Sequence, residues 1–489
     1  MPRTLPIYHS LLFALIVLLG ACHAKKESYI TKKYAAASLQ QDVELLEHVV
    51  MEMHPAIGVY CSKTQMQTEF VKFKQAMRDS LTEREFRLAL KLLLDHLHCG
   101  HTEVLYSKKL YKELKAKSLN YSPIVFLPVH EKLYVLGYLG KKQDSLVKKG
   151  TQIVSVNGIA ADSIIRFSKR FVSGDGFSNS GKEHYVQLGF NSYLVGLFGR
   201  PDTFSVKYFE GKELKEERIA AVKLKTMPNL PLGSKDDSLF KKYKRAAIKY
   251  RYIDSTRKTM LMKIERFSHT GDGRTYRQLF RKLKKNDCEN LVIDLRNNGG
   301  GSIANSYRLL SYLLNEPQTQ TLKTKVKHYP YRKYTRGDIA FRFTRMAFRL
   351  FGKHTVKNDT DVYVYTIKPR KRNHFNGNVM VLINGGSFSA SCLVASYLKS
   401  TKRAVFIGQE TGGGEEGCNA GITPYYRLPN TGIQVRIPAF RIEHDVCAKP
   451  LGKGITPDYQ TDYTFKDIVT RKDLDLMKVK DLIVGDKKP

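Results

Sequence analysis

One stretch, residues 379–399 (VMVLINGGSFSASCLVASYLK), most constrains what this chain can fold into. It begins with the apolar run Val379–Ile383 and breaks at Asn384-Gly385-Gly386. Apolar residues then recur at the three-and-four spacing of one helix face. The pattern predicts a buried strand that passes through a glycine turn into a helix, as is common in α/β proteins. At such a helix start the backbone N–H groups are unpaired and the helix dipole is positive.

Three serines, Ser387, Ser389 and Ser391, lie at this turn. A nucleophilic serine and its oxyanion would be stabilised there by the free N–H groups. The alternative is that a serine only caps the helix. The stretch alone does not separate the two.

The N-terminus indicates export. Arg3 supplies a basic region, Leu11–Leu19 an apolar region too short to span a bilayer, and Leu19–Cys22 (LGAC) closes the segment. These last four residues resemble a bacterial lipobox, which predicts a signal peptide over 1–21, lipidation of Cys22 and a tether over 22–38. The expected location is the cell envelope, on the periplasmic or surface face of a bacterial membrane. A plain signal peptide with a chance cysteine is the alternative.

The formal net charge is +36. Because the chain is predicted to be exported and its lysines are spread out, we expect no nucleic-acid partner. Attraction to an anionic lipid or glycan surface is one interpretation, and a solvated, soluble surface is the other. After Cys22, six cysteines remain, whose disulfide pairing the sequence cannot choose. No pair has zinc-ligand spacing, so we expect no metal, and nothing calls for a cofactor.

Residues 39–225 divide into two predicted domains. Residues 39–118 have helical periodicity and contain His96, His98 and His101, whose spacing does not place all three on one helix face. Residues 119–225 are rich in predicted strands. Within them, Asp144–Gly158 (DSLVKKGTQIVSVNG) resembles the signature of PDZ domains, which bind extended peptides at a sheet edge. A generic β-hairpin is the alternative.

The rest of the chain is predicted to be a connecting segment over 226–258, an α/β catalytic domain over 259–470 and a tail over 471–489. A basic, aromatic insertion occupies 318–378. Within it, Ile339–Phe351 is either an amphipathic surface helix or lid, or part of an ordinary insertion packed on the core.

Six features taken together resemble the S41 serine peptidases, that is, the C-terminal processing and tricorn core proteases. They occur in this order: Cys99–Thr102 (CGHT), the PDZ-like segment, Asp294–Gly301 (DLRNNGGG), Asn384–Ser391 (NGGSFSAS), Glu410–Gly414 (ETGGG) and Gly454–Asp458 (GITPD). The resemblance spans about Leu39 to Asp462. It implies a multidomain α/β protein, with a ClpP/crotonase-like core, an N-terminal helical segment and a PDZ-like β-rich domain.

The resemblance implies roles for individual residues. Ser389 matches the family nucleophile, Ala390 would offer one oxyanion N–H, and Gly299 or Gly300 the other. The processing branch uses a lysine base after the serine, where this chain has Gly414. The tricorn-like branch uses a histidine from the helical segment, and His101 fits that position.

The third catalytic residue departs from the family pattern. Tricorn-like enzymes place an orienting glutamate just before the Gly-Ile-x-Pro-Asp motif, where this chain has Leu451-Gly452-Lys453. Lys453 stands in a Gly-Lys-Gly sequence but beside that motif, so the role of base is not transferred to it. Tricorn-type sites also carry a serine where this chain has Gly100. The fallback acids are Glu443, Glu410 and Glu103.

The sequence therefore predicts a lipid-anchored serine endopeptidase that hydrolyses unfolded or C-terminally presented polypeptides. The rival is a non-catalytic envelope lipoprotein that binds peptides or glycans on the same fold. Acyl-CoA chemistry, suggested by the crotonase-like fold alone, does not suit an exported protein.

Overall fold

The computed structural model describes residues 28–139, 147–226, 240–242, 247–268, 271–445 and 452–485. The predicted signal peptide, Cys22, the Asp144–Leu146 part of the PDZ-like motif and Cys447 lie outside these residues. The remaining five cysteines after Cys22, all described, are free thiols. In the described part of the chain, no helix has both the length and the apolar character needed to cross a membrane.

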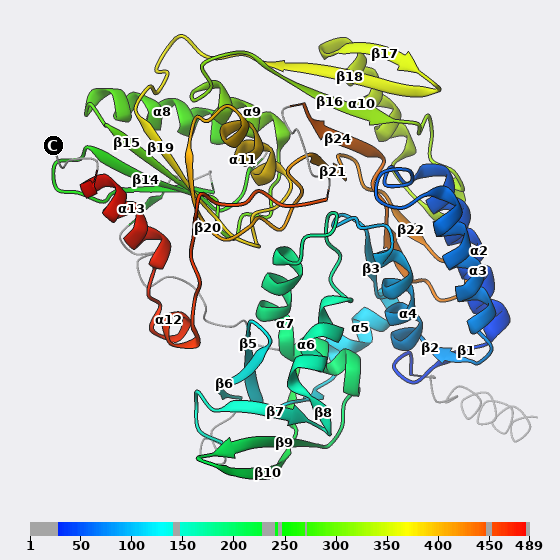
Figure 1. Ribbon diagram of the computed structural model, residues 1–489. Helices are drawn as coiled ribbons and strands as arrows, with labels where there is room; N and C mark the ends of the chain where they lie inside the picture. The colour runs from blue at the N-terminus through cyan, green and yellow to red at the C-terminus, as the bar shows by residue number, and fades with distance from the viewer. Residues whose placement is uncertain are drawn as a thin grey trace, which may run out of the picture.

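A seven-stranded sheet forms the centre of the C-terminal half (Figure 1). Its five consecutive strands from β14 to β25 are parallel, and two antiparallel strands extend it. In spatial order the strands are β12 (Lys241–Lys242), β13 (Ile248–Tyr252), β14 (Thr259–Ile264), β15 (Asn290–Asp294), β19 (Asn378–Ile383), β20 (Val405–Gly408) and β25 (Tyr459–Gln460). The predicted connecting segment, 226–258, therefore supplies two strands of this sheet.

Helices cover both faces of the central sheet. Alternate residues of each strand point to opposite faces, so Ile293 packs under α8 (Asp272–Lys285), α9 (Ile303–Ser311) and α11 (Ala390–Ser400). Val292 packs with Leu476 and Val479 of α13 (Leu474–Gly485) on the other face. The prediction of a tail over 471–489 is therefore corrected, because helix α13 packs its apolar side chains against the sheet. A short helix, α12 (Phe465–Thr470), precedes it.

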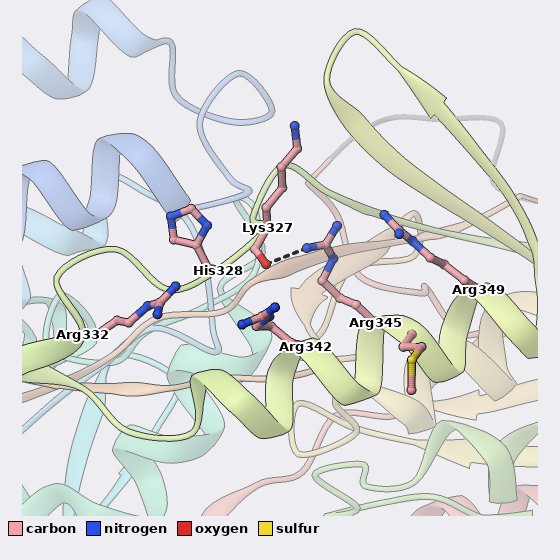
Figure 2. A pocket seen from close by; sticks show the side chains of 7 residues that line it. Lys327, His328, Arg332, Arg342, Arg345 and Arg349 are labelled. Atoms are coloured by element: carbon pink, nitrogen blue, oxygen red, sulfur yellow. Dashed lines mark hydrogen bonds between the residues drawn. The ribbon is translucent and has the colours of Figure 1, made fainter.

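The basic insertion adds a second sheet above the first (Figure 1). Its strands, in spatial order, are β17 (Lys353–Lys357), β18 (Thr360–Ile367), β16 (Gln318–Thr324), β24 (Phe440–His444) and β21 (Gly417–Ala420). A 3-10 turn (Arg332–Tyr334) and helix α10 (Asp338–Phe351) lie between β16 and β17. A cavity of about 560 Å³ opens between α10 and the segment before it (Figure 2).

The N-terminal helices are α2 (Ala36–Met53), α3 (Lys63–Ala76), α4 (Glu83–Asp95) and α5 (Lys108–Ala116), with the short strands β1 (Lys33–Tyr34), β2 (Leu81–Thr82), β3 (Glu103–Leu105) and β4 (Leu119–Tyr121). Capping boxes from Ser62 and Thr82 start α3 and α4. These helices share one apolar core with β16, β18 and β24. Strand β3 also pairs with the hairpin β22 (Tyr425–Arg427) and β23 (Gln434–Arg436). The predicted helical domain is therefore not self-contained.

The PDZ-like region has a core of its own. Its sheet follows the order β10 (Glu213–Ala220), β9 (Thr203–Glu210), β7 (Gln152–Val156), β6 (Lys132–Tyr138) and β5 (Ile124–Val129), with β8 (Ile159–Ala160) paired to β7. Helices α6 (Ala161–Lys169) and α7 (Ser180–Phe198) cover this sheet. Strand β11 (Val222–Leu224) lies outside the sheet and pairs with β4. The sequence predicted strands here and missed the long helix α7.

Arg296 ties the loop after β15 to helix α13. Its guanidinium donates to Asp294 at 2.9 Å, to Asp473 at 2.8 Å and to Asp475 at 2.7 Å. The Asp475 side chain is only 2% exposed, so its charge has little water to stabilise it. Arg296 thereby holds the Asp294–Gly301 loop in place.

We expect Arg296→Gln to lower the free energy of unfolding by about 3–5 kcal/mol, because it leaves buried carboxylates uncompensated. Urea unfolding at pH 7 measures the change. Arg166→Gln is the matched control, since Arg166 forms an exposed pair with Asp162 at 2.8 Å, and such pairs contribute about 1 kcal/mol at most. Equal losses in the two variants would contradict the assignment.

Candidate active site

Ser389 occupies an unusual backbone conformation at the start of α11, with φ 57° and ψ −118°. Non-glycine residues avoid this region, and holding one there costs about 1–3 kcal/mol. Neighbouring bonds fix the turn, since the Phe388 N–H donates to Asn298 O at 3.0 Å. Ser389 stands at the N-cap position, yet its side chain makes no capping hydrogen bond. The capping interpretation therefore does not account for this serine.

The two neighbouring serines have structural partners. The Ser387 hydroxyl donates to Leu295 O and the Ser391 hydroxyl donates to Asn298 O, each at 2.8 Å. Both residues are fully buried. These bonds join the β19–α11 turn to the loop after β15, because parallel strands end at the same edge of the sheet. In the described part of the chain, Ser389 is the one of the three serines whose hydroxyl lies within hydrogen-bond distance of a histidine.

That histidine is His101, whose Nε2 lies 3.2 Å from Ser389 Oγ. His101 sits in a turn between α4 and β3, where Arg436 Nε donates to its carbonyl at 3.1 Å. The Phe388 ring lies against the imidazole, with ring centroids 4.8 Å apart. The structure thus brings together the two residues that the sequence paired. Of the other two histidines in the cluster, His96 lies near Glu69 and His98 near Phe177.

Burial, with a smaller contribution from the Arg436 charge, lowers the pKa of His101 to about 3. The imidazole is therefore neutral at physiological pH, the state that a general base needs. Its Nδ1 is shielded from solvent and has no hydrogen-bond partner among the described residues. A buried ring nitrogen without a partner is unfavourable, so an unassigned orienting group is expected nearby.

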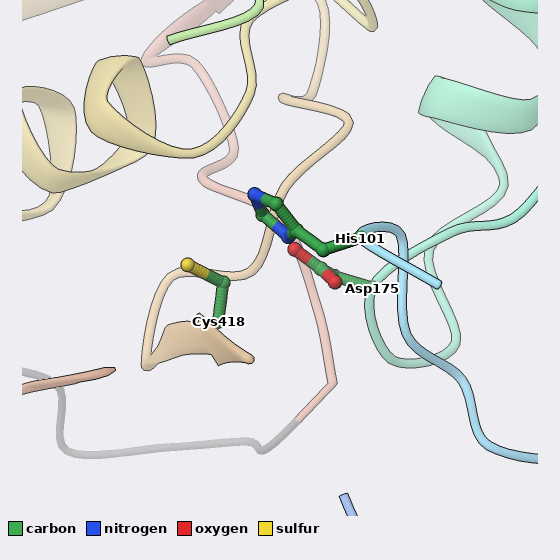
Figure 3. A group of neighbouring side chains, drawn as sticks. All are labelled: His101, Asp175 and Cys418. Carbon is green, nitrogen blue, oxygen red and sulfur yellow. The ribbon is translucent and has the colours of Figure 1, made fainter. Parts of the chain in front are cut away.

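Asp175, which the sequence reasoning missed, lies beside His101 without a direct hydrogen bond to it in the described part of the chain. A ring nitrogen of His101, a carboxylate oxygen of Asp175 and Cys418 Sγ lie within 4.8 Å of one another (Figure 3). Asp175 Oδ1 accepts the Gly100 N–H at 2.7 Å, whereas Oδ2 is buried and has no partner among the described residues. Burial raises the pKa of Asp175 to about 7. The only sequence signal was an acid between two glycines, far from His101 along the chain.

The loop that carries Asp175 also holds the His101 turn. Besides the Asp175–Gly100 bond, Ser173 Oγ donates to Thr102 O at 2.7 Å and the Gly176 N–H donates to His98 O at 3.0 Å. This loop joins α6 to α7, so the PDZ-like region supplies part of the site.

The fallback acids lie elsewhere. Glu443 pairs with Lys323 at 2.6 Å, Glu410 accepts the Gly454 N–H at 2.8 Å, and Glu103 lies 3.6 Å from Arg436. In the described part of the chain, none of them forms a hydrogen bond with His101. Lys453 likewise has no described bond to Ser389.

The hydrogen bonds of the structure narrow the choice of backbone N–H groups that could stabilise an oxyanion. The Gly300 N–H donates to Asn298 Oδ1 at 2.9 Å and is therefore occupied. Among the described residues, the N–H groups of Gly299 and Ala390 have no acceptor. Gly299 and Ala390 are thus the available donors, and Gly300 has a different role. A Cβ at Gly300 would lie 2.7 Å from Ser389 Cβ and 2.8 Å from Ala390 N.

The His101–Asp175–Cys418 cluster has donor types that bind metals. However, burial and the nearby Asp175 raise the pKa of the Cys418 thiol well above its usual value. The Cys418 thiol is therefore protonated, and the thiolate is the form that binds metals.

Residues 258–461 match the model of peptidase family S41. This region of the chain belongs to peptidase family S41. S41 peptidases are serine proteases, so the protein is a serine-type peptidase. A search of curated proteins by sequence gave no match.

Solved structures share the fold over nearly the whole chain. Mature CPAF is 16% identical with a TM-score of 0.62, and the match covers 93% of this chain and 99% of that one. Mature CPAF complexed with lactacystin is 14% identical with a TM-score of 0.62, covering 92% and 98%. The predicted multidomain α/β fold of an S41 peptidase is confirmed.

Gly300→Ala is expected to lower kcat at least about 100-fold, as the loss of an oriented oxyanion site does. The added methyl group collides with the Ser389 turn, and Gly300 has a φ of 99°, which alanine rarely adopts. Gly299→Ala is the control, because nothing lies within 4 Å of its Cβ and alanine keeps the N–H. Peptide hydrolysis measures both, and similar losses in the two variants would refute this role for Gly300.

Proposed function

We propose that this peptidase is an endopeptidase in which Ser389 is the nucleophile and His101 the general base. The observation that carries this is the 3.2 Å contact between Ser389 Oγ and His101 Nε2. Two further observations support the proposal. The Ser389 side chain makes no capping hydrogen bond to helix α11, and the low pKa of His101 keeps its imidazole neutral.

The reaction proceeds by two acyl transfers. Ser389 Oγ attacks the peptide carbonyl carbon while His101 Nε2 takes the hydroxyl proton. The N–H groups of Gly299 and Ala390 stabilise the oxyanion, and His101 then returns the proton to the leaving amine. In the second step, water loses a proton to His101 and attacks the acyl-enzyme. The carboxylic acid leaves, and the proton returns to Ser389 Oγ.

Asp175 acts as the positioning residue for His101. A ring nitrogen of His101 and a carboxylate oxygen of Asp175 lie within 4.8 Å of each other, close enough for the carboxylate charge to act on the imidazole. The ionised carboxylate would then favour the imidazolium that forms during attack. This replaces the glutamate that the family pattern places elsewhere.

The substrate is proposed to be an unfolded or C-terminally presented polypeptide. We expected a peptide to add as a strand to the PDZ-like sheet, yet α7 already binds the β5 edge. Asn191 donates to Ile124 O at 2.6 Å and accepts the Phe126 N–H at 3.0 Å, and Gln187 donates to Pro128 O at 2.9 Å. Strand β10 forms the other edge of this sheet and carries mostly exposed side chains. A peptide strand would therefore pair there, or at β5 after α7 moves.

The location is proposed to be the bacterial cell envelope, through a lipid on Cys22. The support is the basic, apolar and Leu-Gly-Ala-Cys sequence of the N-terminus. The rival, a non-catalytic lipoprotein that binds peptides or glycans, shares this location and differs only in turnover.

Hydrolysis of unfolded casein tests the nucleophile and the base. We expect Ser389→Ala and His101→Ala each to lower kcat by at least about 10⁴-fold, because neither residue acts without the other. His96→Ala, in the same histidine cluster but more than a third exposed, should keep full activity. Loss in Ser389→Ala alone would point to a different base. Equal, low rates in all folded variants would favour the binding protein.

The pH dependence tests Asp175. Because its pKa is raised to about 7, the carboxylate forms only above that pH, whereas His101 is neutral at any pH well above 3. We therefore expect kcat/KM to rise as the pH increases through about 7 and then to level off. Asp175→Asn should lower the plateau and abolish the rise, while Glu443→Gln should change neither. A rise that persists in Asp175→Asn would reject this role and leave the Ser389–His101 assignment standing.

A further inference from the structure

Helix α10 exposes an apolar stripe to solvent. Ile339 is 71% exposed, Phe343 63%, Met346 52% and Leu350 74%. At 100° per residue these four side chains fall within a sector of roughly 60°. Single exposed apolar residues are ordinary, but a contiguous row of large ones marks an interaction surface.

The opposite side of α10 is fixed to the protein. Phe341 is fully buried and stacks on Tyr329 with ring centroids 4.7 Å apart. Phe348 lies edge-on to Phe440 at 5.5 Å. Arg345, on the same side, donates to Lys327 O at 2.6 Å and pairs with buried Asp361. Since this side anchors the helix, the exposed stripe is displayed on a rigid element.

A basic cavity adjoins the stripe. Its volume is about 560 Å³, and its lining consists of four arginines, Lys327, His328 and Met346, with no acidic residue among the described residues that line it. Met346 belongs to both the cavity and the stripe. Figure 2 shows the arginines of α10 on the side where Lys327, His328 and Arg332 lie.

Two of these arginines have unused donors. Arg345 is 8% exposed, and its buried Nε has no hydrogen-bond partner among the described residues. Arg342 makes no ion pair within the described part of the chain. Two nearby carboxylates form ion pairs with the other arginines of the cavity. Asp361 lies 3.2 Å from Arg349, and Asp338 lies 3.4 Å from Arg332. The cavity therefore has spare positive charge and a geometry suited to an anion.

We propose that α10 docks the protein on an anionic membrane surface. The stripe enters the boundary between headgroups and acyl chains, and the cavity takes a lipid phosphate at its side. An apolar row flanked by arginines is the pattern of helices that lie in the membrane interface. Charge complementarity selects the occupant, because the chain's net charge of +36 opposes contact with a second copy and favours an anionic partner. This surface is separate from Ser389 and His101 and does not rest on the peptidase mechanism.

The absence of tryptophan from the chain permits a site-specific test. Phe343→Trp places one fluorophore in the stripe of the full chain. We expect its emission to shift to shorter wavelength, and to be quenched by brominated acyl chains, with phosphatidylglycerol-containing vesicles but not with pure phosphatidylcholine vesicles. Phe209→Trp, on β9 and 54% exposed, is the matched control and should not respond. The reporter reads local insertion, so a lipid at Cys22 does not produce the signal.

Arginine variants test the phosphate cavity. In the Phe343→Trp background, Arg342→Gln should lower the vesicle partition coefficient about fivefold, the effect of one basic residue near an anionic surface. Arg166→Gln should leave it unchanged. Equal signals on neutral and anionic vesicles, or none on either, would overturn the proposal. A concentration-dependent blue shift without vesicles would replace it with self-association. Binding to a sulfated glycan, with no change in the emission of the Phe343→Trp variant on anionic vesicles, would also reject it.

Discussion

The closeness of the Ser389 turn to Gly300 is the constraint on which the site depends. Ser389 adopts φ 57°, and any side chain at Gly300 would meet its Cβ at 2.7 Å. Two loops can come this close because they follow neighbouring parallel strands, β15 and β19. The same approach leaves the N–H groups of Gly299 and Ala390 unoccupied and releases the Ser389 hydroxyl from capping. Backbone strain at Ser389 is thus stabilised by the packing of a second loop.

The His101 side of the site depends on a different part of the fold. The turn at 98–102 follows helix α4, and three hydrogen bonds join it to the Ser173–Gly176 loop of the PDZ-like region. Burial there lowers the pKa of His101 to about 3 and raises the pKa of Asp175 to about 7, so the imidazole is neutral at neutral pH and the Asp175 carboxyl titrates there. Any movement of the PDZ-like region on the core would shift the imidazole.

Much of the fold could be predicted from the sequence, because hydrophobic periodicity and turn residues are local signals. The strand at 378–383 and the helix that follows its glycine turn, at 390–400, lie close to their predicted positions. Three predicted segments have packing partners that their sequences did not indicate. The connecting segment, the tail and the N-terminal helices all pack on distant elements, and their weak local patterns do not reveal those partners. Helix α13 is the clearest example, since it packs on one face of the central sheet and Arg296 donates a hydrogen bond to Asp473 just before it.

The sequence by itself determined the serine peptidase family and the pairing of Ser389 with His101, since the motifs that carry them are short and contiguous. Only the tertiary structure brought Asp175 near His101, engaged the Gly300 N–H with Asn298 while leaving the Gly299 N–H without an acceptor among the described residues, and exposed the α10 stripe. Asp175 lies more than seventy residues from His101 in the chain, and no periodicity links the two. Orientation and burial arise from contacts between distant segments, so a linear pattern cannot specify them.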